Sequence, residues 1–134
     1  MPYTILIFLT RHPSLTSEEF RNHWENVYIP LNKSLTGHLF PLLFKRHYFA
    51  RIDRAGFGGA ANRDRPALLL RGSVDDFDYD SMGEMTFDSE AAFREYYRVL
   101  YEPKAAALLA REEKYFLDTQ KVIIVVVGDS TGSR

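Results

Sequence analysis

The sequence predicts an α+β domain whose elements follow the order β-α-β-β-α-β. Four segments rich in β-branched and aromatic residues, a composition typical of strands, begin at Tyr3, Leu43, Ser81 and Lys121. Amphipathic helical patterns follow the first and the third of these segments. In this order a four-stranded antiparallel sheet carries both helices on one face, which is the ferredoxin-like arrangement.

Length and composition limit the possible functions. The chain has 134 residues, of which 46% are hydrophobic, so we expect a single domain over residues 1–128 and a flexible tail over residues 129–134. A net charge of -1 gives no positive field for nucleic acid. No segment approaches the ~18 apolar residues of a membrane span, and cysteine-based chemistry is excluded because the chain has no cysteine. We expect a cytoplasmic protein with a small-molecule partner.

The first strand and helix have clear local signals. Residues 3–11 form the strand, which ends before Pro13 because proline cannot donate to a ladder. Thr16 or Ser17 caps the helix that follows. Apolar residues at helical spacing define its expected buried stripe, which consists of Phe20, Trp24, Val27 and Leu31. Pro30 is expected to kink or end this helix.

The remaining elements surround one long loop. The further strands are predicted at residues 43–52, 81–87 and 121–128. The last of these is a nearly unbroken apolar run, which is typical of a central strand buried on both faces. Residues 53–79 are rich in glycine and acidic residues, and we interpret them as a flexible lid. A second helix begins at Asp88 or Ser89, breaks at Pro103 and continues as an alanine-rich piece.

The sheet face without helices needs a cover. A bare sheet face is a large apolar surface, which soluble monomers rarely expose. We therefore expect a homodimer whose two sheets pack face to face, the arrangement called a dimeric α+β barrel.

The second strand carries candidates for acid/base chemistry. His47 lies in mid-strand on the same face as Lys45 and Arg51. If this face lines a pocket, His47 can exchange protons while Arg51 holds an anionic oxygen. The other face offers a competing set that includes Tyr48, and a solvated or interfacial histidine is the simpler alternative.

Glu84 is an isolated carboxylate in the third strand. Burial of a carboxylate is costly unless it is paired, and burial raises its pKa toward values useful for catalysis. The alternative is a structural ion pair with Arg46 or Arg51 on the neighbouring strand. Met85 beside it can form an adaptable wall for a flat substrate, although methionine also fills ordinary cores.

Two polar rings border the apolar stripe of the first helix. His23 precedes Trp24, and Tyr28 follows one turn later, so both can reach a cleft between helix and sheet. Both are equally compatible with border residues whose polar tips are wet.

Other chemistries lack their motifs. The four histidines and the acidic run at 75–80 do not have metal-ligand spacing, so no metal site is expected. The glycine-rich stretch at 56–60 lacks the lysine of a phosphate-binding loop, and no nucleophile elbow is present. We expect no cofactor.

Three sequence stretches point to a family: "FLTRHPSLTSEEFRNHWENVYIPL", "RHYFAR" and "FDYDSMGEMTFDSEAAF". Together they resemble the EthD domain family of dimeric α+β barrels, especially its fungal members found beside aromatic polyketide synthases. The helix resembles the family pattern H-[WY]-E-x-V-H-x-P-L, with Tyr28 in place of the second histidine. A phenol is a poorer base than imidazole at neutral pH, so this residue is expected to orient or protonate an oxygen.

The resemblance implies a cofactor-free lyase of secondary metabolism that dehydrates, decarboxylates or cyclises an aromatic polyketide. The residues expected to transfer protons are His47, Glu84, Tyr28 and His23. Those expected to bind the substrate are Arg51, Trp24, Tyr48 and Met85. A non-catalytic carrier of the same ligand and a cofactor-free oxygenase acting on anthrones are the alternatives.

Overall fold

The structure is a computed structural model that describes residues 1–51 and 67–133. Its elements, in chain order, are β1 (Tyr3–Leu9), α1 (Ser17–His23), η1 (Trp24–Tyr28), α2 (Ile29–Thr36), η2 (Gly37–Leu39), β2 (Leu43–Tyr48), β3 (Ser81–Phe87), α3 (Glu90–Leu100), α4 (Pro103–Phe116), η3 (Thr119–Lys121) and β4 (Ile123–Val126). About half of the predicted lid, residues 53–66, lies outside the described residues. The second strand was predicted to reach Ile52, but β2 ends at Tyr48.

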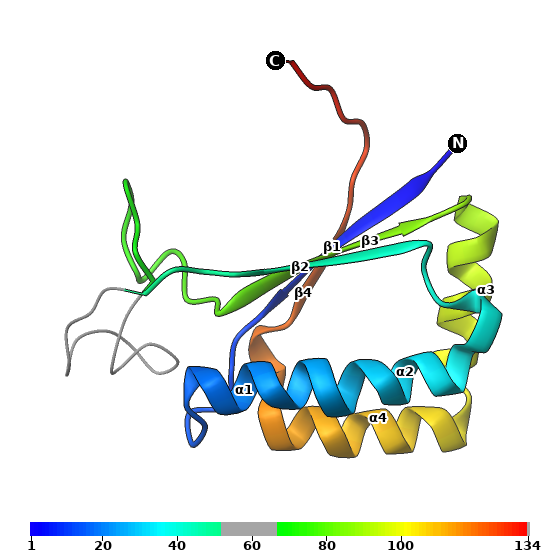
Figure 1. Cartoon of the computed structure of the whole chain (residues 1–134), viewed down its shortest axis with the longest axis horizontal. Helices are drawn as coiled ribbons and strands as arrows, with labels where there is room; N and C mark the ends of the chain where they lie inside the picture. The colour runs from blue at the N-terminus through cyan, green and yellow to red at the C-terminus, as the bar shows by residue number, and fades with distance from the viewer. Residues whose placement is uncertain (52–66, 134) are drawn as a thin grey trace.

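The predicted fold class is confirmed. The four strands form one antiparallel sheet in the order β2-β3-β1-β4. The helices lie together on one face of this sheet, with α1, α2 and α4 running beneath it and α3 at one end (Figure 1).

Alternation along β1 and β3 separates two sheet faces. Ile5, Leu9, Met85 and Phe87 belong to the buried core beneath the helices. Because successive side chains of a strand point to opposite faces, the residues between them point away from the helices. The helix-facing side is therefore the core side of the sheet, and the opposite side is its outer face.

One wide turn changes the phase of the first helical segment. The N–H of Ile29 donates to the carbonyl of Trp24, an i to i−5 bond that makes η1 a π-helical turn. A π turn contains one residue more than an α turn, so the buried positions after it shift by one along the sequence. The predicted stripe is consequently wrong at Val27, which is 40% exposed, while Ile29 and Asn32 are buried.

Pro30 does not end the helix. It directly follows the π turn, inside a helical run that continues without a break from Ser17. The helix continues to Thr36 and stops at Gly37, whose φ of 55° favours glycine. At the other end, Thr16 caps α1 as predicted, and its backbone N–H donates to the Glu19 side chain in return.

The last strand corrects a second prediction. β4 pairs only with β1 and forms an edge of the sheet, rather than a central strand buried on both faces. Its four residues are 45–49% exposed. The outer face next to it is also apolar, since Leu6 and Phe8 of β1 lie opposite Val125 and Ile123. The described chain therefore leaves an apolar surface on the side of the sheet away from the helices.

Candidate functional site

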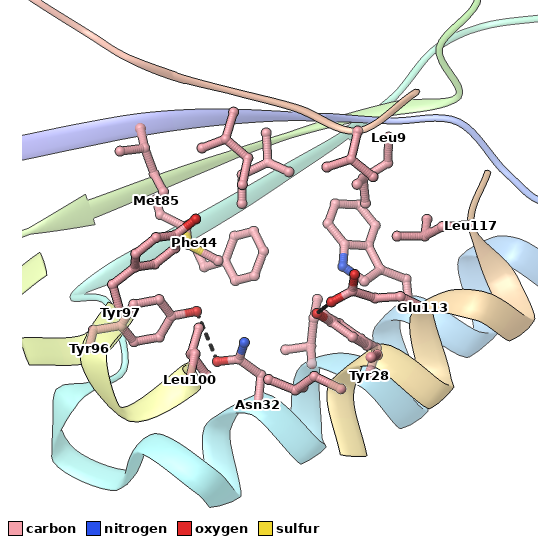
Figure 2. A pocket seen from close by; sticks show the side chains of 18 of the residues that line it. Leu9, Tyr28, Asn32, Phe44, Met85, Tyr96, Tyr97, Leu100, Glu113 and Leu117 are labelled. Atoms are coloured by element: carbon pink, nitrogen blue, oxygen red, sulfur yellow. Dashed lines mark hydrogen bonds between the residues drawn. The ribbon is translucent and has the colours of Figure 1, made fainter. Parts of the chain in front are cut away.

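A cavity of about 400 Å³ lies between the core side of the sheet and the helices. Figure 2 shows Phe44 and Met85 projecting from the sheet toward side chains of α2, α3 and α4. The volume falls in the ~300–1,000 Å³ range of small-molecule sites. Most of the lining is apolar or aromatic, and the polar groups among the described residues are concentrated on the helices.

Tyr28 and Glu113 form one polar pair in the cavity wall. The Tyr28 hydroxyl donates a 2.5 Å hydrogen bond to Glu113 Oε2. A bond this short is typical of a hydroxyl donating to an ionised carboxylate. Burial, followed by the charge of Glu113 and this hydrogen bond, raises the pKa of Tyr28 far above the usual value of a tyrosine. Tyr28 therefore stays protonated and acts as a hydrogen-bond donor.

Asn32 and Tyr96 form the second polar pair. The Tyr96 hydroxyl donates to Asn32 Oδ1 over 2.9 Å, and burial raises the pKa of Tyr96. Both residues are buried, and both line the cavity. The Asn32 amide nitrogen projects into the cavity and makes no hydrogen bond within the described part of the chain (Figure 2). An amide donor that faces a cavity without a partner is a position where a ligand oxygen can bind.

Trp24 and Met85, two of the residues expected at the substrate, do line the cavity. Gly83 allows the rings of Phe44 and Trp24 to lie close to β3, because a Cβ at Gly83 would be 2.8 Å from the Phe44 ring and 3.4 Å from the Trp24 ring. The absence of a side chain at this position of β3 therefore lets two aromatic walls approach the sheet.

The cavity extends to the surface beside β4. Tyr101, which is 67% exposed, and Ile124, which is 45% exposed, are among its lining residues. The Tyr101 hydroxyl donates to the Tyr97 hydroxyl over 3.3 Å, and burial followed by this bond raises the pKa of Tyr97 to about 12. Two phenols and an edge strand thus border the opening.

His23 lies outside the cavity lining. Its Nε2 is 2.9 Å from Glu112 Oε1, and its ring packs on Tyr115 and Phe116. The loose pairing considered between His23 and Tyr28 is not formed, since each of them binds one of two adjacent glutamates of α4. His23 connects α1 to α4.

His47 and Glu84 lie on the outer face of the sheet. Phe44 and Tyr48 pack against the helix-side core, so the alternation of β2 turns Lys45 and His47 away from the helices. Glu84 lies opposite Lys45 in the β2–β3 register and shares that face. The structure thus places these two of the four expected proton-transfer residues across the sheet from Tyr28.

Tyr48 and Arg46 face the helices but belong to a separate cluster. Arg46 binds Glu25 through two nitrogens at 2.6 and 3.0 Å, and the Tyr48 hydroxyl donates to the same carboxylate. These contacts, led by the hydrogen bond from Arg46, lower the pKa of Glu25. The cluster holds η1 against β2 and does not line the cavity.

Arg51, the expected anion-binding residue, pairs with Asp80. Asp80 also accepts the backbone N–H of Arg11, whose guanidinium is buried beside it. Burial raises the pKa of Asp80, and the arginines oppose that shift. The pairing expected between Glu84 and either Arg46 or Arg51 is therefore not found, because these arginines bind Glu25 and Asp80 instead.

Two cavity residues were missed by the sequence analysis. Glu113 lies four residues after the buried Leu109 and three before the buried Phe116, so helical spacing alone indicates a carboxylate on a buried face. The predicted stripe placed Leu31 at the buried position, and the extra residue of the π turn moves that position to Asn32.

Within residues 1–51 and 67–133, no three histidine or acidic side chains are grouped so that they could hold a metal ion. In the same part of the chain, every helix is too short or too polar to span a bilayer.

The sheet order and the chamber beneath it define a ferredoxin-like α+β protein with an internal binding cavity. The EthD domain model matches residues 12–120. The chain therefore belongs to the EthD domain family. A comparison with curated protein sequences gives no match.

Solved structures share this fold along nearly the whole chain. A protein from Arabidopsis thaliana gives a TM-score of 0.58 at 14% identity, covering 98% of this chain and 99% of that one. An EthD family protein from Bacillus halodurans gives 0.53 at 16% identity, with 96% and 99% covered. A dimeric ferredoxin-like protein of unknown function from Thermobifida fusca gives 0.51 at 16% identity, with 95% and 90% covered. At these identities the likeness concerns the fold.

Proposed function

We propose that the protein is a cofactor-independent lyase that acts on an oxygenated aromatic polyketide bound in the cavity. The observation that carries this proposal is that a carboxylate, Glu113, and an unpartnered amide donor, Asn32, face the same apolar chamber. General acid/base catalysis at a ketone requires these two elements, a proton acceptor and a donor for the carbonyl oxygen.

The groups suffice for loss of water from a β-hydroxy ketone. Glu113 removes the proton from the carbon next to the carbonyl, and the electron pair moves to the carbonyl oxygen, where Asn32 Nδ2 donates a hydrogen bond. The enolate then re-forms the carbonyl and makes the new carbon–carbon double bond while the carbon–oxygen bond at the β position breaks. The departing hydroxide takes the proton from Glu113 and leaves as water.

Tyr28 and Tyr96 support these two groups. Tyr28 occupies Oε2 of Glu113, which orients the carboxylate and leaves Oε1 for the substrate proton. Tyr96 occupies Oδ1 of Asn32, which turns the amide nitrogen toward the ligand. In each pair the phenol holds the other side chain in one orientation, so its second polar atom is already directed at the ligand.

An aromatic polyketide fits the lining. Trp24, Phe44 and Tyr97 supply flat apolar surface, and Met85 is adaptable in shape. The sequence stretches that resemble EthD proteins beside fungal polyketide synthases support the same ligand class.

A homodimer is part of the proposal. The outer face is apolar along β1 and β4, and β4 is an exposed edge. A second copy of the chain packed on this face would cover both, as the description of the Thermobifida fusca protein as dimeric suggests.

The function is tested by incubating the purified protein with a β-hydroxy ketone and a β-keto acid of the polyketide type. Water loss and carbon dioxide are followed by mass spectrometry, and oxygen uptake by an electrode. We expect product formation that Glu113→Gln abolishes. Full activity of Glu113→Gln together with loss of activity in His47→Ala or Glu84→Gln would move the site to the outer face. Binding without turnover favours a carrier, and oxygen uptake without added metal favours an oxygenase.

A further inference from the structure

We propose that the cavity selects uncharged hydroxy ketones and excludes carboxylates, and that Glu113 is the residue that sets this selectivity. The inference rests on the proposed function and narrows it, because it favours dehydration over the decarboxylation of a substrate that enters as a carboxylate.

The charge of the cavity is the first support. Among its described lining residues Glu113 carries the single ionisable group other than the phenols, and no lysine, arginine or histidine lines it. The 2.5 Å bond from Tyr28 has the length of a hydroxyl donating to an ionised carboxylate. The lining therefore offers a carboxylate ligand a like charge and no opposite one.

Three basic side chains on the elements around the cavity do not face into it. Arg46, on the core side of β2, binds both oxygens of Glu25. His23 is bound to Glu112, and Lys45 lies on the outer face. A ligand carboxylate in the chamber would thus lose its hydration without gaining an ion pair, which is strongly unfavourable in an apolar site.

The spacing of the two polar pairs defines the ligand that does fit. Tyr28 and Asn32 are four positions apart on one helical face, where side chains are neighbours at roughly 5–6 Å. Because the phenols occupy Glu113 Oε2 and Asn32 Oδ1, Oε1 is left to accept a hydrogen bond from a ligand and Nδ2 is left to donate one. The complementary ligand presents a hydroxyl or acidic C–H to Glu113 and a carbonyl oxygen to Asn32 from one edge. A ring with a neighbouring hydroxyl and ketone approximates this edge, and its other edge faces the apolar sheet.

The test uses three ligands of matched shape, measured by isothermal titration calorimetry at pH 7.5. They are 1-hydroxy-2-acetonaphthone, 1-hydroxy-2-naphthoic acid and the methyl ester of that acid. We expect the ketone and the ester to bind at least tenfold more tightly than the acid. The ester comparison requires no variant, so it stays decisive if a substitution prevents folding.

Variants then assign the selectivity to one residue. Glu113→Gln keeps the shape of the side chain and an acceptor for Tyr28 but removes the charge. It should therefore raise the affinity for the acid, so that the ester binds no more than about threefold more tightly than the acid. Glu112→Gln is the matched control, since Glu112 is the residue before Glu113 and binds His23 outside the lining. This variant should keep the wild-type ratio of ester affinity to acid affinity.

Each other outcome has its own meaning. If the acid binds as tightly as the ester, or if Glu113→Gln leaves the ratio unchanged, the inference is overturned while the cavity remains the binding site. If none of the three ligands binds, the proposed function of the cavity fails and takes this inference with it. Turnover is not needed for any of these readings.

Discussion

The phenol of Tyr28 and the carboxylate of Glu113 lie 85 positions apart in the chain and are joined by a 2.5 Å hydrogen bond. This bond connects η1 to α4 and brings a charge into a chamber whose other described lining residues are uncharged. The sequence resemblance led us to expect a histidine at the tyrosine position. A histidine could carry a positive charge next to Glu113, whereas a phenol supplies a neutral donor.

Removing the phenol oxygen should separate its two roles. Tyr28→Phe leaves Glu113 without its donor, so we expect the free energy of unfolding to fall by about 1 kcal/mol and turnover to fall at least tenfold. Urea unfolding and a product assay measure the two effects. Tyr115→Phe, at an exposed ring on the same helix as Glu113, should change neither. Unchanged turnover in Tyr28→Phe would remove this residue from the site.

The stability of the fold should depend on Tyr28 at high pH. The pKa of Tyr28 is raised by folding, so the folded state favours the protonated phenol. This contribution is fully present below the unfolded value near pH 10 and is lost as the pH rises above it. Urea unfolding between pH 9 and pH 11 should therefore show a steeper decline for the wild type than for Tyr28→Phe. If the free energy of unfolding declined equally with pH in the two proteins, the raised pKa of Tyr28 would be contradicted.

The Asn32–Tyr96 pair allows stability and function to be distinguished. Asn32→Leu strands the buried Tyr96 hydroxyl, which should lower the free energy of unfolding by about 2 kcal/mol. Adding Tyr96→Phe removes the stranded group and should restore most of that loss. Neither variant regains the amide donor, so turnover should stay low in both. A double variant that recovers turnover would show that Asn32 acts only through the fold.

Gly83 is expected to control the size of the chamber. The Cβ of Gly83→Ala would lie 2.8 Å from Phe44 Cε1, so the ring must move toward the cavity. We expect affinity for the naphthyl ketone to fall several-fold and the free energy of unfolding to fall by about 1 kcal/mol. Gly128→Ala serves as the control because a Cβ there meets nothing within 4 Å. If Gly83→Ala and Gly128→Ala bound the naphthyl ketone equally well, the close approach of the Phe44 ring to Gly83 would be contradicted.

The outer face should mediate dimerisation. Val125→Glu places a charge on an apolar residue of this face that is 45% exposed in the single chain. We expect the wild type to be a dimer and this variant a monomer by light scattering, with circular dichroism unchanged. Leu70→Glu, at a side chain that is 98% exposed, should remain dimeric. A wild type that is monomeric at micromolar concentration would refute the packing of sheet on sheet.

Local signals were enough to predict the fold. The third strand was predicted at the residues it occupies, Ser81–Phe87, because its alternation is regular. The helix starts were predicted from their caps. The edge position of β4 was not predictable, because composition reports that a strand is apolar and its number of neighbours depends on distant segments.

The candidate site was only partly predictable. Tyr28, Trp24 and Met85 were identified, since a polar ring on an apolar helix border and a methionine on a strand are visible in sequence. The face of β2 that meets the helices was left open, and the structure turns His47 away from them. Glu113 was overlooked although the spacing of α4 indicates it, whereas Asn32 needed the phase of the first helix, which a single π turn alters.

That π turn lets the chain hold one extra residue without moving the site. Deleting one residue from the turn, such as the exposed Asn26, would turn the bond from Ile29 to Trp24 into an ordinary α-helical bond, so Asn32 would keep its direction into the chamber. A deletion between the turn and Asn32 would instead rotate every later position by about 100° about the helix axis. Related chains that differ by one residue within this turn would then share both the fold and the groups presented to the ligand.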